Sequence, residues 1–154
     1  MTAIQITREG PLAIVTLNRP EKRNALAMPH WQALGAAIRA FAGDESVRAV
    51  VLTGAGGHFC AGADLKKQIA DDPNLFDHLD EYLDEYHGVI RAIVRCPKPT
   101  IAMMDGAAVG FGADIAFACD VRVSSTTAYA QEKFVKIGLM PDGGGTFWLP
   151  RLVG

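Results

Sequence analysis

Two glycine-rich loops limit most strongly what this chain can fold into. Each loop follows a short apolar run, at residues 48–53 and 100–104, and each leads into a Gly-Ala-Asp triplet, at residues 62–64 and 112–114. A glycine loop between a buried strand and a helix brings backbone N–H groups close to a ligand, because no Cβ stands in the way. The repeat predicts an α/β fold of stacked strand–helix units rather than one open sheet.

Hydrophobic patterning predicts further strands on both sides of the loops. Residues 3–8 alternate, and residues 12–17 form a β-rich run that follows a Glu-Gly-Pro turn, so the two segments are expected to form a hairpin. The short apolar runs at 48–53, 100–104 and 121–124 are each expected to form a buried strand.

Helices are predicted where apolar residues recur with helical spacing. This pattern covers residues 29–42 and, from about residue 75, a long amphipathic stretch to residue 94. Residues 111–119 are almost wholly apolar and predict a helix buried on all sides, and residues 141–145 are expected to open a last helix. The acidic residues 70–78 lack periodicity and are expected to form a mobile surface segment.

Composition excludes several classes of protein. A chain of 154 residues has the length of one domain, here residues 1–154, and its net charge of −2 offers no basic field for nucleic acid or an anionic membrane. No apolar run is long enough for a membrane span. Cys60, Cys96 and Cys119 form no Cys-x-x-Cys pair, so neither a disulfide framework nor a zinc site is indicated, and we expect a cytoplasmic protein without a metal.

The glycine loops do not match the known phosphate-binding loops. The P-loop signature is absent, neither loop has the third glycine of the dinucleotide fingerprint, and no serine lies in a G-x-S-x-G elbow. Two N–H donors on separate loops would instead form an oxyanion hole, in which each donor lowers a barrier by roughly 3–4 kcal/mol. Such a site would suit the enolate of a thioester and needs no side-chain nucleophile.

Four motifs, in order along the chain, resemble those of the enoyl-CoA hydratase/isomerase (crotonase) superfamily. The resemblance implies a crotonase-like spiral of repeated ββα units (the ClpP/crotonase fold), with the C-terminal part missing. Full-length relatives continue further and form a homotrimer or a dimer of trimers, so this chain is expected to expose an apolar surface. The motifs are residues 18–25 (NRPEKRNA), 59–66 (FCAGADLK), 98–112 (KPTIAMMDGAAVGFG) and 138–146 (GLMPDGGGT).

The resemblance also implies where an acyl-CoA thioester would bind. The oxyanion donors would be the backbone amides of Ala63 and Phe111, and the Phe111 ring should narrow the acyl pocket, since relatives often have glycine there. Tyr82, Tyr86 and Phe76 could line this pocket or pack in the core. Coenzyme A would be part of the substrate rather than a separate cofactor. Its expected contacts are Lys22, Arg23, Ala25, Ala61 and Lys66.

Departures from the family pattern bear on the reaction. Hydratases of the family place two glutamates around a catalytic water; here those positions hold Asp114 and Phe134. Glu132 is two positions away and is expected to turn away from the site if its segment is extended or helical. Asp142 stands where isomerase branches, including the ring-epoxide isomerases of phenylacetate degradation, place an acidic residue. Alternatively, Asp142 and Asp114 could each stabilise a helix start.

These observations favour an acyl-CoA isomerase that shifts a double bond or rearranges a ring epoxide. Asp142, with Asp114, would be the catalytic carboxyl group, since one carboxylate can remove a proton at one carbon and return it at another. An enoyl-CoA hydratase is the first alternative. A catalytically silent, CoA-binding fragment is the second.

Overall fold

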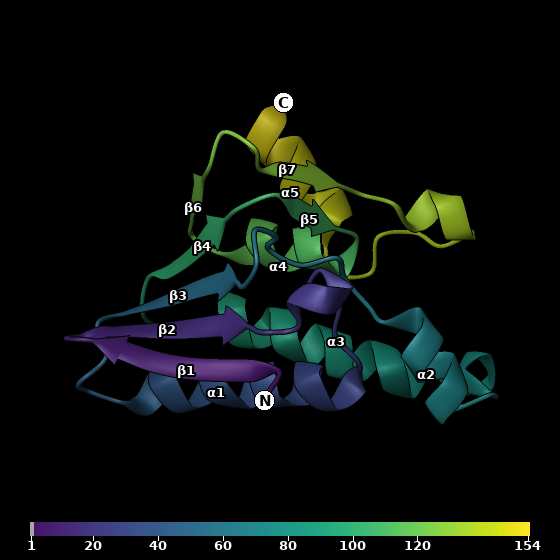
Figure 1. The fold of residues 1–154 in the computed structure, drawn as a ribbon, viewed down its shortest axis with the longest axis horizontal. Helices are drawn as coiled ribbons and strands as arrows, with labels where there is room; N and C mark the ends of the chain where they lie inside the picture. The colour runs from purple at the N-terminus through teal and green to yellow at the C-terminus, as the bar shows by residue number, and fades with distance from the viewer. Residues whose placement is uncertain (1) are drawn as a thin grey trace.

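A five-stranded sheet is the larger of the two sheets in the computed structural model, which describes residues 2–154 (Figure 1). Strands β1 (Ile4–Glu9) and β2 (Leu12–Leu17) form the expected antiparallel hairpin. Strands β3 (Ala49–Gly54), β4 (Thr100–Met104) and β6 (Val121–Ser124) follow in parallel, so the order is β1-β2-β3-β4-β6. All five strands lie within a residue or two of the segments predicted from the sequence.

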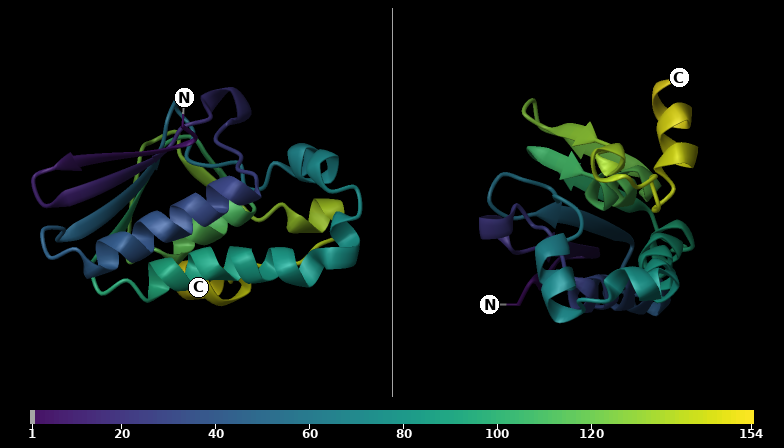
Figure 2. Two further views of the ribbon diagram at one scale, coloured as in Figure 1. Left: turned by 90° about the horizontal axis from the view of Figure 1, so that it is seen from below. Right: turned by 90° about the vertical axis from the view of Figure 1, so that its right-hand side faces the viewer.

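Two long helices pack together along one face of this sheet. Helix α1 (Met28–Gly43) and helix α3 (Leu79–Val94) run side by side beneath the strands (Figures 1 and 2). Both helices were expected, except that a separate 3-10 turn, η2 (Leu75–His78), precedes α3. The face of α1 turned to the core carries Trp31, Leu34, Gly35, Ala37, Ile38 and Phe41.

A second layer stacks above the first. Strands β5 (Ala107–Val109) and β7 (Tyr129–Gln131) pair in parallel as a small sheet of their own. Helix α4 (Phe111–Ala118) lies beneath this sheet with all its residues buried, and helix α5 (Gly145–Val153) packs against α4 (Figure 1). The prediction of stacked units rather than one open sheet is therefore confirmed, as is the fully buried helix.

The acidic segment at residues 70–78 has more regular secondary structure than its sequence suggested. Helix α2 (Leu65–Asp71) reaches into it, and η2 follows after three residues. The segment is attached to the body by Leu75, which is buried in the core. Apart from Leu75, the described side chains of this segment are exposed or partly exposed, as expected, and its mobility stays a prediction. The side chain of Phe76 lies outside the part of the structure that is described.

Strand β6 corrects another expectation, because it is exposed rather than buried. It is the last strand of the sheet, and Val121 and Val123 remain 47% and 55% exposed. Further exposed apolar side chains follow at Val135 and Met140, as the predicted apolar surface requires. Two short 3-10 turns, η1 (Pro20–Lys22) and η3 (Phe134–Ile137), complete the described elements. None of the helices described for residues 2–154 is both long and apolar enough to span a membrane.

Candidate active site

The two glycine loops meet at an isolated bridge between Cys60 and Ala108. The N–H of Cys60 donates to the carbonyl of Ala107 at 3.0 Å, and the N–H of Val109 donates to the carbonyl of Cys60 at 2.8 Å. A Cβ on Gly112 would lie only 2.3 Å from the Cys60 carbonyl oxygen. Glycine at residue 112 therefore allows α4 to start against the first loop, which is the close approach that the sequence implied.

The backbone amides of Ala63 and Phe111 follow this contact, each three residues further along its own loop. Residue 111 is the first of α4, where N–H groups have no acceptor within the helix. A Cβ on Gly62, next to Ala63, would lie 3.4 Å from the Phe111 nitrogen. Within residues 2–154 neither amide donates a hydrogen bond, and both residues line the same cavity. Two free donors at one cavity wall are the arrangement that an oxyanion hole requires.

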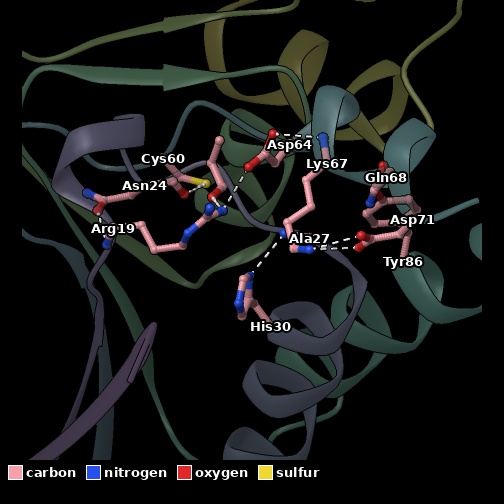
Figure 3. A network of polar contacts seen from close by, with 11 residues as sticks. Arg19, Asn24, Ala27, His30, Cys60, Asp64, Lys67, Gln68, Asp71 and Tyr86 are labelled. Carbon is pink, nitrogen blue, oxygen red and sulfur yellow. Dashed lines mark hydrogen bonds and ion pairs between the residues drawn. The ribbon is translucent and has the colours of Figure 1, made fainter. Parts of the chain in front are cut away.

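A polar network fixes the loop that carries Ala63 (Figure 3). The Arg19 guanidinium pairs with Asp64 at 3.0 Å and donates to the carbonyl of Ala25 at 2.6 Å. Asn24 is fully buried, and its side chain amide donates to the carbonyls of Ala55 and His58. Asp64 also accepts the N–H of Lys67 at the start of α2. Asp64 thus stabilises the loop and the start of the helix.

The residues expected to contact coenzyme A gather beside this loop. The N–H of Ala61 donates to the carbonyl of Arg23 at 2.9 Å, which places the segment with Lys22, Arg23 and Ala25 next to Ala61. Lys22 and Arg23 are exposed, and Lys66 is exposed at the start of α2. Their binding role stays a prediction.

A cavity of about 250 Å³ opens beside the two amides. Its walls come from the glycine loops, α2, η2, α3 and η3, and they are largely apolar. Asp142 is the one carboxyl group among the lining residues that the structure describes. The apolar lining includes Leu75, Leu79, Tyr82, Leu83, Tyr86, Phe134, Ile137 and Leu139.

Three aromatic rings pack together next to this cavity, and two of them, Phe111 and Tyr86, belong to its lining. The Phe111 ring meets Trp31 with centroids 5.0 Å apart and Tyr86 with centroids 4.7 Å apart, and it is buried. The Tyr86 hydroxyl accepts a hydrogen bond of 2.5 Å from Gln68 on α2. Tyr86 and Tyr82 both line the cavity and contact the core, so the two roles weighed from the sequence occur together.

Asp142 enters the cavity from the turn before α5. Its side chain is half-buried, and its Oδ1 atom has no hydrogen-bond partner within residues 2–154. Burial raises the pKa of Asp142, and the charge of His87 partly offsets that rise. His87 on α3 also contacts the Asp142 carbonyl through Nε2 at 2.9 Å, a contact for which the sequence gave no signal. A carboxylate in the wall of an apolar cavity can accept a proton from a ligand.

Asp114 lies behind this turn rather than in the cavity. It is fully buried, and its Oδ2 atom accepts the N–H of Gly143 at 3.1 Å. This contact gives Asp114 a structural role, because it ties α4 to the turn before α5. Burial, followed by the charge of Glu132, raises the pKa of Asp114 to about 7.

Glu132 faces Asp114 rather than the cavity, whose described lining does not include it. A Cβ on Gly145 would lie 2.2 Å from Glu132 Oε1 and 2.6 Å from Asp114 Oδ1, so both carboxyl groups face one point. Residue 132 lies in an irregular stretch between β7 and η3, where no regular alternation sets the side-chain direction. Burial also raises the pKa of Glu132.

Other reactive groups near the site do not suggest different chemistry. Burial raises the pKa of the Cys60 thiol to about 12, so this thiol stays protonated and is a poor nucleophile. Within residues 2–154, no three His, Cys, Asp or Glu side chains are grouped as metal ligands.

Comparison with known proteins identifies the class to which this fold and site belong. The family model described as enoyl-CoA hydratase/isomerase matches residues 7–154, and the chain belongs to that family. The "probable enoyl-CoA hydratase" of Rhodobacter capsulatus is 46% identical over 143 residues, which are 93% of this chain and 54% of the relative. The 1,2-epoxyphenylacetyl-CoA isomerase of Escherichia coli is 35% identical over 95% of this chain and 56% of the relative.

A solved structure supports the same crotonase fold. A Thermobifida fusca protein in complex with acetoacetyl-CoA superimposes with a TM-score of 0.88 and 34% identity, over 99% of this chain and 62% of that one. The chain therefore spans about half the length of the curated relatives that it matches.

Proposed function

We propose that the protein is an acyl-CoA isomerase that moves a double bond, or rearranges a ring epoxide, through a thioester enolate. Its activity, its acyl-CoA substrate, its assembly as a homotrimer or dimer of trimers and its cytoplasmic location are parts of this proposal. Membership of the enoyl-CoA hydratase/isomerase family supports the substrate class. The choice of isomerase depends on the carboxyl groups of the cavity.

One observation carries that choice. Asp142 is the one carboxyl group in the described cavity lining, and Phe134 occupies the position where a hydratase of this family would hold its second glutamate. Water addition needs groups that orient and deprotonate a water molecule, whereas a double-bond shift needs one group that removes and returns a proton. A single carboxylate beside an apolar wall suits the second reaction.

The proposed steps balance with this one group. The thioester carbonyl accepts the N–H groups of Ala63 and Phe111, which stabilise negative charge on its oxygen. The Asp142 carboxylate takes a proton from an acyl carbon, and the electron pair of that C–H bond moves into the conjugated enolate. The Asp142 carboxylic acid then donates the proton to a different carbon, which completes the shift and restores the carboxylate.

An enoyl-CoA hydratase remains the second candidate function. The name of the Rhodobacter capsulatus relative, a probable enoyl-CoA hydratase, favours it. In that case Asp142 would deprotonate a water molecule, and the product would gain an oxygen atom from solvent.

Solvent labelling separates the two candidates. The purified protein is incubated with a panel of 2-enoyl- and 3-enoyl-CoA thioesters in water enriched in deuterium and oxygen-18, and the products are analysed by mass spectrometry. An isomerase shifts the double bond without oxygen-18, and deuterium enters on carbon when the proton held by Asp142 exchanges with solvent before its return, whereas a hydratase incorporates both labels. Oxygen-18 in the product would refute the isomerase, and neither a shifted double bond nor deuterium on carbon with any thioester would refute enolate chemistry altogether.

A further inference from the structure

Two carboxyl groups face each other beneath the glycine turn that precedes α5. Asp114 projects from the buried helix α4, and Glu132 comes from the stretch after β7. A Cβ on Gly145 would lie 2.6 Å from Asp114 Oδ1 and 2.2 Å from Glu132 Oε1, so the two oxygens are close neighbours. Within residues 2–154, Asp114 Oδ1 and both Glu132 oxygens are buried without a hydrogen-bond partner. A buried oxygen without a hydrogen-bond donor is costly. A proton bound to one carboxyl group and donated to the other is the simplest way to satisfy these oxygens.

The glycine turn is shaped around this pair. Gly143 donates its N–H to Asp114, and a Cβ on Gly143 would lie 2.5 Å from the Cβ of Asp114. The corresponding Cβ on Gly145 would strike Glu132 and Asp114 together. The two carboxyl groups therefore lie directly beneath Gly143 and Gly145, the turn residues that follow Asp142.

Repulsion between the two carboxylates determines how many protons the Asp114–Glu132 pair binds. Two carboxylates in contact inside a protein cannot both ionise at moderate cost, so one proton is retained between them. The retained O–H can donate from one carboxyl group to the other, which satisfies the orphaned Asp114 oxygen. The charged or titratable groups facing the pair are Asp142 in the turn and, beyond it, His87 on α3.

We propose that Glu132 is a positioning residue of the active site: it shares one proton with Asp114, and the pair holds the turn that carries Asp142. The inference rests on the proposed function, because Asp142 is the base in that reaction. Glu132 acts only through Asp114 and the glycine turn, since neither carboxyl group of the pair is among the cavity lining. Loss of the shared proton places two negative charges beneath the turn and displaces Asp142 from the acyl group.

Infrared spectroscopy tests the shared proton without turnover. The band of a protonated carboxylic acid is compared at pH 6 between the wild type, Glu132→Gln and the exposed control Glu45→Gln. The wild type and the control should show one more protonated carboxyl group than Glu132→Gln, because the Gln amide donates to Asp114 in place of the proton. Equal bands in the wild type and Glu132→Gln would overturn the proposal. Asp142 is present in all three proteins, so any band from its own carboxyl group is the same in each spectrum.

Kinetics test the effect on Asp142. Glu132→Leu should lower kcat roughly 10- to 100-fold with little change in KM, as expected for a displaced base. Glu132→Gln should recover most of that loss, and its rate should no longer decline at alkaline pH, where the wild-type pair loses its proton. Equal kcat values for the Leu and Gln variants, or an unchanged alkaline decline in Glu132→Gln, would contradict the proposal. If the wild type shows no enolate chemistry, the proposed function fails, and the infrared comparison still decides the shared proton.

Discussion

Asp114 Oδ2 accepts the N–H of Gly143 at 3.1 Å, and this contact ties the buried helix α4 to the turn before α5. Helix α4 begins with Phe111, one of the two candidate oxyanion donors, and the turn carries Asp142. One buried carboxyl group thus links an oxyanion donor to the candidate base, so that their separation is fixed by the core rather than by a surface loop.

Asp142→Asn should abolish most of the proposed isomerase activity. The amide cannot take up a proton, so we expect kcat to fall by about 10²–10⁴-fold while acyl-CoA still binds. Asp80→Asn, at an exposed position on α3, is the matched control and should keep the wild-type rate. A wild-type rate of double-bond migration in Asp142→Asn would remove this residue from the mechanism.

Gly112→Ala should force the two glycine loops apart. Its Cβ would lie 2.3 Å from the Cys60 carbonyl oxygen, so the backbone must shift. We expect the free energy of unfolding to fall by about 1–3 kcal/mol, measured by urea denaturation. On α3, Gly88→Ala meets no atom within 4 Å and should instead raise stability by about 0.5–1 kcal/mol. Equal effects of the two substitutions would argue against close contact between the loops.

The Asp114–Glu132 pair predicts that stability falls as pH rises through the weakly acidic range. The pKa of Asp114 is raised from 3.8 to about 7 in the folded protein. Between these values the folded state binds more protons than the unfolded chain, so the free energy of unfolding decreases with increasing pH. Thermal melting between pH 4 and pH 8 should show this slope in the wild type and in Asp80→Asn. It should be weaker in Asp114→Asn, and an unchanged slope there would show that another group is responsible.

Arg19→Ala should destabilise the loop that carries Ala63. The substitution leaves Asp64 buried without its ion pair and removes the donor to the Ala25 carbonyl. We expect a loss of about 3 kcal/mol in the free energy of unfolding. The exposed control Arg95→Ala should change it by less than about 0.5 kcal/mol. A loss no larger than that of the control would mean that the Arg19 network does not hold the loop.

Much of this fold could be predicted because its main signals are local. The residues of each segment predict its secondary structure on their own: β3 and β4 are apolar runs, β2 alternates, and α1 has helical spacing. Strand β6 shows the limit, since a short apolar run does not distinguish an edge strand from a central one. Its exposure depends on what lies beside it in the sheet, which is not a property of the run itself.

The site was predicted in part for the same reason. The motifs place Ala63 and Phe111 on glycine loops and Asp142 at a helix start, and the structure brings these residues to one cavity. Glu132 could not be placed, because it lies outside regular secondary structure and its direction depends on Asp114 and Gly145. His87 contacts Asp142 across 55 positions in sequence, and such a contact has no local signal.

The carbonyl stretch of a bound thioester tests the central claim most directly. An unreactive acyl-CoA, labelled with carbon-13 at the thioester carbon, is bound to Asp142→Asn, and its carbonyl band is recorded by isotope-edited infrared spectroscopy. Polarisation by the amides of Ala63 and Phe111 predicts a clear shift to lower frequency than in water, and Gly112→Ala should reduce that shift. A carbonyl band at its aqueous frequency in the saturated protein would contradict the oxyanion hole and the enolate chemistry built on it.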